Sequence, residues 1–201
     1  MKPLLLCLAL SLCGAPLAAQ TPAQGAYTIK NFRFASGQTL PEVRIHYRTL
    51  GAPATDAAGR TTNAVLILHG TTGNGGGFFR PEFSGELFGP GQPLDSAKYF
   101  LIIPDDIGHG GSSKPSDGMH AKFPSYCYAD MIEGEYRLVT DGLHVNHLRL
   151  VMGTSMGGMH TWLWGSTHPD SMDALVPLAS LPAPISGRNR VWRRMISDAI
   201  R

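Results

Sequence analysis

Apolar side chains follow two different patterns along the first 150 residues, and each pattern predicts a different kind of strand. Residues 27–34 and 42–50 alternate polar and apolar side chains, as half-buried strands do, and Gly37 between them predicts an antiparallel pair. Three later runs are apolar almost throughout, at 64–68, 99–104 and 148–152. Strands without alternation are buried on both faces, which is typical of parallel sheets covered by helices.

Helical spacing of apolar residues is found in the second half of the chain. Residues 130–148 carry apolar side chains at roughly helical intervals, and a second helix-like segment ends at His168-Pro169-Asp170. Residues 172–179 predict a further strand, and another helix starts at Arg188. Strands that alternate with helices predict an α/β fold with a doubly wound, mostly parallel sheet.

The first 19 residues have the composition of a secretion signal. Lys2 supplies a positive charge, residues 4–12 form an uncharged apolar core, and Ala19 ends a segment typical of cleavage sites. We therefore expect export to the periplasm or the medium, with one domain over residues 20–201. The apolar core is too short to span a bilayer comfortably, so we expect no membrane attachment after cleavage.

Cysteine count and charge narrow the classes of function. Cleavage would leave Cys127 as the one cysteine, which cannot form an internal disulfide. A net charge of +2 indicates neither a nucleic-acid partner nor an anionic membrane surface. Arginines gather late, which fits a solvated helix face or a contact with a substrate carboxylate. They are Arg188, Arg190, Arg193, Arg194 and Arg201.

The strongest candidate for chemistry is Ser155, in the sequence Gly153-Thr154-Ser155-Met156-Gly157 between a predicted strand and a predicted helix. Strand, G-x-S-x-G and helix form the nucleophile elbow of α/β-hydrolase-fold enzymes. The tight turn strains the serine backbone, and a side chain at Gly153 or Gly157 would collide with neighbouring backbone. The alternative is a glycine-rich turn in which Ser155 only caps the helix.

A glycine-rich loop, residues 69–77, follows the apolar run 64–68. Phosphate binding is one interpretation, but the loop lacks G-x-x-x-x-G-K-[ST] and any nearby lysine. The other is an oxyanion loop, with the backbone N–H groups of Thr71 and Met156 as the two donors. We expect the ring of His69 to bond to backbone rather than to act as a general base.

His109 lies beside two carboxylates, Asp105 and Asp106, in the loop after the strand 99–104. This grouping could supply a base and an acid for Ser155. Such groups follow their strand too closely to face the serine, so we expect this loop to shape the pocket instead.

Several motifs together resemble the homoserine O-acetyltransferase-like branch of the α/β-hydrolase superfamily. The residues that carry the resemblance are Phe34-Ala35-Ser36-Gly37, Leu40-Pro41, Tyr47, Thr49-Leu50-Gly51, Gly153 to Met159, Trp164, His168-Pro169-Asp170, Asn189, Trp192 and Ala199-Ile200. The resemblance implies the α/β-hydrolase fold and a Ser-Asp-His triad in which Ser155 is acylated. It maps Thr71 and Met156 onto the oxyanion hole, requires no metal or other cofactor, and implies a small ester or acyl donor as substrate and a homodimer in the full-length form.

The resemblance also implies what lies beyond this chain. In that branch the triad Asp and His follow the cap, past residue 201, and residues 187–201 would begin the cap helix. We therefore expect either a fragment of a longer protein or a truncated chain without its last strands. An exported enzyme has no obvious supply of acyl-CoA, so ester hydrolysis is the expected reaction. The alternatives are an O-acyltransferase that uses an acyl-CoA, and a catalytically inert chain.

Overall fold

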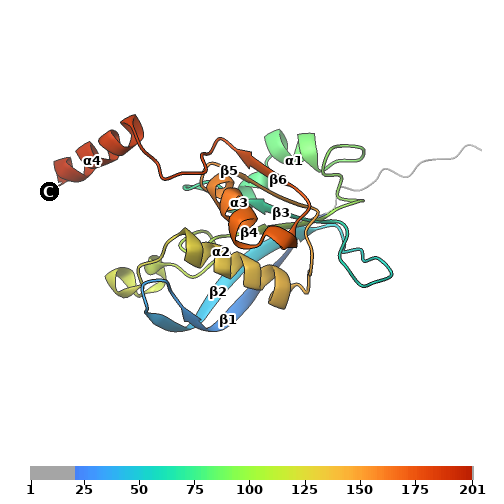
Figure 1. The fold of residues 1–201 in the computed structure, drawn as a ribbon, viewed down its shortest axis with the longest axis horizontal. Helices are drawn as coiled ribbons and strands as arrows, with labels where there is room; N and C mark the ends of the chain where they lie inside the picture. Colours follow the sequence, from blue (N-terminus) through green and yellow to red (C-terminus); the bar gives the residue numbers. More distant parts are fainter. Residues whose placement is uncertain (1–20, 201) are drawn as a thin grey trace, which may run out of the picture.

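The computed structural model describes residues 21–200, so the predicted signal at 1–19 lies outside the described residues. A six-stranded sheet with the order β1-β2-β4-β3-β5-β6 forms its centre (Figure 1). The strands are β1 (Ala23–Arg33), β2 (Thr39–Leu50), β3 (Ala64–Leu68), β4 (Phe100–Pro104), β5 (Leu150–Thr154) and β6 (Leu175–Leu178). β1 and β2 pair antiparallel, as does β2 with β4, whereas β4, β3, β5 and β6 run parallel. The antiparallel start and the parallel centre are confirmed.

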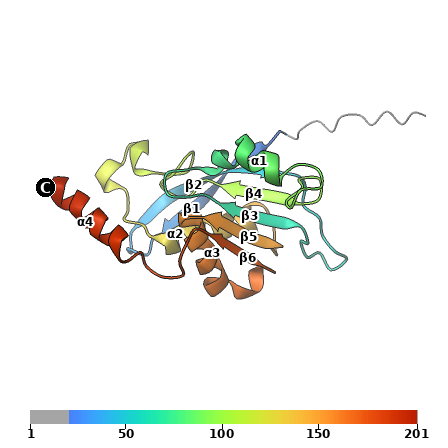
Figure 2. The same cartoon turned by 90° about the horizontal axis from the view of Figure 1, so that it is seen from above.

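Helices cover both faces of this sheet (Figure 2). They are α1 (Pro81–Leu87) on one face, and α2 (Tyr128–Arg137) and α3 (Met156–Thr167) on the other. A further helix, α4 (Arg188–Ile200), follows β6, and 3-10 turns lie at Gly75–Phe79, Pro115–Asp117, His120–Lys122 and Pro169–Ser171. On one face Leu66 and Leu68 of β3 share a core with Trp164 of α3. On the other face Val65 and Ile67 pack with aromatic residues around α1. Alternate side chains of one apolar strand thus serve two cores, which confirms the doubly wound sheet.

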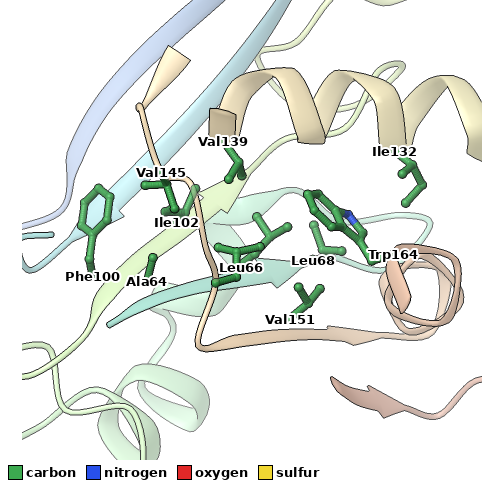
Figure 3. Packing of buried hydrophobic residues seen from close by; sticks show 11 residues of the cluster. Ala64, Leu66, Leu68, Phe100, Ile102, Ile132, Val139, Val145, Val151 and Trp164 are labelled. Atoms are coloured by element: carbon green, nitrogen blue, oxygen red, sulfur yellow. The ribbon is translucent and has the colours of Figure 1, made fainter. Parts of the chain in front are cut away.

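The core under α2 and α3 places the elbow helix on the sheet. Ile132 and Val139 point from α2 and its continuation toward the strands, and the fully buried Trp164 lies between helix and sheet (Figure 3). Burying each such side chain stabilises the fold by about 1.5–3 kcal/mol. Because α3 follows β5 directly, this packing also fixes the turn that carries Ser155.

The helix expected over 130–148 is wrong in its second half. α2 ends at Arg137, one π-helical turn spans Leu138–Gly142, and the chain then continues irregularly to β5. His144 has a φ of 54°, which a right-handed helix cannot contain, and Gly142 before it packs so closely on the Tyr27 ring that a Cβ there would lie 2.8 Å from it. Val145 still buries its side chain, so an irregular connection reproduced the apolar spacing of a helix.

α4 stands apart from the sheet (Figure 1). Its apolar side chains, Val191, Trp192, Met195, Ile196 and Ile200, are all exposed. Among the described residues, no helix has the length and apolar character needed to cross a membrane.

Candidate active site

Ser155 occupies the sharp turn between β5 and α3. Its φ of 55° and ψ of −112° lie in a region that L-residues rarely adopt, and its backbone N–H donates to Leu178 O at 2.9 Å. Ser155 is the N-cap residue of α3, but its side chain makes no capping hydrogen bond. The serine is exposed, so its Oγ is free to meet a ligand at the carboxyl edge of the parallel strands.

Two glycines permit this turn. A Cβ on Gly153 would collide with the carbonyl of Gly157, and a Cβ on Gly157 would collide with the carbonyl of Leu68. Both obstacles are backbone atoms of the strand or helix start, which cannot rotate away as a side chain can. The elbow therefore depends on glycine at both positions.

The glycine-rich loop after β3 faces the elbow. A Cβ placed on Gly70 would lie 3.5 Å from Ser155 Cβ. Within residues 21–200, the backbone N–H groups of Thr71 and Met156 donate to no acceptor. Free backbone donors beside an exposed serine are the elements from which an oxyanion hole is built.

His69 fixes the peptide that joins Gly70 to Thr71. Its Nδ1–H donates to Gly70 O at 2.8 Å, and the N–H of Gly73 donates to the same oxygen at 2.9 Å. Its Nε2 accepts from the N–H of Asp106 at 3.1 Å, which assigns the neutral Nδ1–H tautomer. The expectation that His69 bonds to backbone is confirmed. Because the N–H of Thr71 lies opposite the held carbonyl in the same planar peptide, His69 also sets its direction.

His109 ties its own loop to the glycine-rich loop. Its Nε2 lies 2.7 Å from Thr71 O and its Nδ1 lies 3.2 Å from Ile107 O. The imidazole therefore donates to a carbonyl of the glycine-rich loop, which agrees with the expected role in shaping the pocket.

Asp105 holds both the glycine-rich loop and the loop that follows β4. Its fully buried carboxylate accepts from the N–H groups of Gly75 at 2.7 Å and Gly111 at 2.8 Å, and from Arg48 Nη1 at 2.9 Å. Burial alone raises the pKa of Asp105, but the two backbone donors and the Arg48 guanidinium outweigh burial and hold that pKa below its usual value.

Three buried ionisable residues lie close to one another beneath the glycine-rich loop. Asp106 follows β4, Glu135 belongs to α2, and His160 belongs to α3. Sequence reasoning did not single out Glu135 or His160. The signal was available: each sits three or four positions from residues on the buried face of its helix, such as Ile132 and Trp164.

An apolar cavity of about 610 Å³ lies along α3 on the side of the loop that follows β6. Its walls are Tyr128, Met159, Trp162, Leu163, Ser166 and residues 181–185. Met159 lines the cavity one helical turn after Ser155, and its backbone N–H donates to Ser155 O at 3.0 Å. No lining residue carries a full charge.

In the part of the chain that the structure describes, no histidine hydrogen-bonds to Ser155. His69, His109 and His160 are each engaged with backbone or with Glu135 instead. The elbow and the glycine-rich loop opposite it are therefore in place. None of the histidine hydrogen bonds among the described residues supplies a base for Ser155.

Comparisons with known proteins agree with this arrangement. A family model described as alpha/beta hydrolase fold matches residues 63–196. A probable acyltransferase of Methanothermobacter thermautotrophicus is 34% identical over 155 residues, covering 77% of this chain and 47% of that protein. A homoserine O-acetyltransferase of Thermobifida fusca is 34% identical over 181 residues, covering 83% and 46%.

A solved structure shares the fold. The acetylester hydrolase from Corynebacterium glutamicum superimposes with a TM-score of 0.74 at 23% identity, covering 88% of this chain and 49% of that one. The chain thus spans about half the length of the curated relatives it matches.

Proposed function

The chain belongs to the alpha/beta hydrolase fold family, and we propose that it carries out acyl transfer with Ser155 as the nucleophile. The observation that carries the proposal is the strained, exposed Ser155 facing a loop that offers the free N–H of Thr71, with the free N–H of Met156 beside it. Ser155 Oγ attacks the carbonyl carbon of an ester, and the two N–H groups stabilise the resulting oxyanion. The alcohol leaves with a proton, and water then releases the acid from acyl-Ser155.

The reaction also needs a base for the proton of Ser155. A serine without an imidazole partner loses most of its reactivity. We place the triad Asp and His of the whole protein past residue 201, as the resemblance implies. The homodimer implied by the same resemblance stays a prediction.

The preferred substrate is an ester that water hydrolyses, because the predicted export separates the protein from acyl-CoA. A second candidate is an O-acyltransferase, favoured by the 34% identity to a homoserine O-acetyltransferase. Hydrolysis of p-nitrophenyl acetate without transfer from acetyl-CoA to homoserine supports the first. Transfer with little hydrolysis supports the second.

Reaction with a fluorophosphonate probe tests the nucleophile directly. The protein purified from its own cells should carry the adduct on the peptide that contains Ser155, and Ser155→Ala should carry none. Ser197→Ala, at an exposed position on α4, should label like the parent. Absence of labelling in the natural protein would favour the inert chain.

Export and chain length are open to one measurement each. Amino-terminal sequencing of the protein from the periplasm or medium should begin at Gln20. The intact mass then separates the remaining alternatives: a mass well above that of the 201 residues directs the search for Asp and His to the additional part, whereas a mass equal to residues 20–201 favours an inert product.

A further inference from the structure

Asp106, Glu135 and His160 form a closed polar site inside the protein. Their relative exposures are 2%, 1% and 0%, and one ligating atom from each lies within 4.8 Å of the others. They come from the end of β4, from α2 and from α3, the three elements packed around this point. The site is built, since no single helix or loop brings these residues together.

The hydrogen bonds assign most of the protons. Glu135 Oε1 accepts from His160 Nδ1–H at 2.8 Å, and Glu135 Oε2 accepts from Trp164 Nε1–H at 2.6 Å. An ionised Asp106 leaves both of its oxygens, together with His160 Nε2, without a hydrogen-bond partner among the described residues. Buried polar atoms without partners cost about 1–3 kcal/mol each, so an ionised Asp106 is unfavourable.

The surroundings supply no compensating charge. Asp106 faces His69, Glu135 and His160, while the ring of Tyr128 packs edge-on against His160 at 4.8 Å. No lysine or arginine among residues 21–200 pairs with either carboxyl group. Burial, and then the charge of Glu135, raise the pKa of Asp106 to about 8. Burial raises the pKa of Glu135 to about 7 and lowers that of His160.

Asp106 also contacts the ring that holds the glycine-rich loop. Its backbone N–H donates to His69 Nε2 at 3.1 Å, and its Oδ2 lies 3.6 Å from the same nitrogen. An ionised carboxylate there would favour a proton on His69 Nε2. That nitrogen cannot carry a proton while it accepts the hydrogen bond from the N–H of Asp106. A neutral carboxyl group leaves Nε2 as an acceptor and keeps the Nδ1–H that points at Gly70 O.

We propose that Asp106, Glu135 and His160 are a proton-sharing site, in which Asp106 is a carboxylic acid that donates to Glu135, and that neutral Asp106 is a positioning residue acting through His69 on the glycine-rich loop. The positioning role of Asp106 rests on the proposed function, because it assumes that the N–H of Thr71 donates to an oxyanion. The protonation pattern of the three residues does not depend on that function.

The test is the protonation state of the two rings, read from long-range ¹H–¹⁵N spectra of histidine-labelled protein between pH 6 and pH 9. At neutral pH His69 and His160 should each carry one proton, on Nδ1. Raising the pH through the ionisation of Asp106 should shift the His69 Nε2 resonance. Asp106→Asn, which has no proton to lose, should abolish that shift and keep the tautomer, whereas Asp141→Asn, at an exposed site, should leave the shift intact.

Three results would overturn the proposal. They are an Nε2–H tautomer or a doubly protonated ring at His69, a His69 resonance that is constant over the whole pH range, and binding of Zn²⁺ to His160 that displaces the shared proton. If Asp106→Asn does not fold, the ¹³C carboxyl resonance of Asp106 in the parent decides, and an ionised Asp106 throughout contradicts us. None of these readouts uses catalysis, so Ser155→Ala gives the same answer and failure of the proposed function remains distinguishable.

Discussion

Ser155 pays a conformational cost that glycine at the same position would not. Its φ of 55° and ψ of −112° are open to glycine and strained for every residue with a Cβ. We expect Ser155→Gly to unfold at higher urea concentration than Ser155→Ala, by about 1 kcal/mol in free energy of unfolding. Both variants lack the hydroxyl, so the difference between their free energies of unfolding reports the backbone strain alone. Equal stabilities would mean that the turn is relaxed and the strain argument fails.

Gly157 is a position at which any side chain should disturb the elbow. Alanine there places a methyl group against the carbonyl of Leu68, and overpacking of this kind costs about 1–3 kcal/mol. Gly85→Ala is the matched control, because the same methyl group in α1 meets nothing within 4 Å and should stabilise the helix by about 0.5–1 kcal/mol. Urea unfolding of the two variants gives the comparison, and a Gly157→Ala chain as stable as the parent would contradict it.

At the scale of elements, the junction of β4, α2 and α3 should make stability depend on pH. The folded pKa values of Asp106 and Glu135 are raised to about 8 and about 7, above those of the unfolded chain. The folded state then holds more protons than the unfolded state, so the free energy of unfolding falls as pH rises toward 8. His160 acts oppositely, with stability lost as pH falls below its ordinary value of 6.5.

Urea unfolding at pH 6.5, 7.5 and 8.5 measures the effect of the two carboxyl groups, because His160 acts at lower pH. We expect the free energy of unfolding to fall by up to about 1.4 kcal/mol per pH unit for each retained proton, and to fall less for Asp106→Asn. A parent protein whose stability is flat or rises over this window would show that both carboxyl groups ionise at ordinary values.

Strands and helices were predictable from the sequence where the burial of an element allows one arrangement of apolar and polar residues. The apolar run 64–68 coincides with β3, because a strand buried on both faces has no polar position to blur its ends. The irregular course of residues 143–149 was not predictable, since Val145 and Leu148 reach the core from a connection that is neither helix nor strand. α1 and the preceding 3-10 turn lie in a glycine- and proline-rich stretch that lacks helical periodicity and were not predicted. The buried site was missed because its three residues are adjacent only once the layers are packed.

At the scale of the whole molecule, the two edges of the sheet differ in their protection against association. β1 presents polar side chains and an ion pair between Lys30 and Glu42. β6, the other edge among the described strands, leaves Val176 and Leu178 38% and 41% exposed. Apolar edge strands without charges pair with other chains, whereas a lysine on the edge discourages such pairing.

We therefore expect the 201-residue chain to associate as its concentration rises, through β6. Val176→Lys should shift sedimentation velocity profiles toward monomer, while Thr28→Lys on β1 should not, because that edge is already polar. The exposed apolar face of α4 is the competing surface. Association that persists in Val176→Lys but is lost in Trp192→Lys would assign it to the helix, since a charge on one surface leaves the other available.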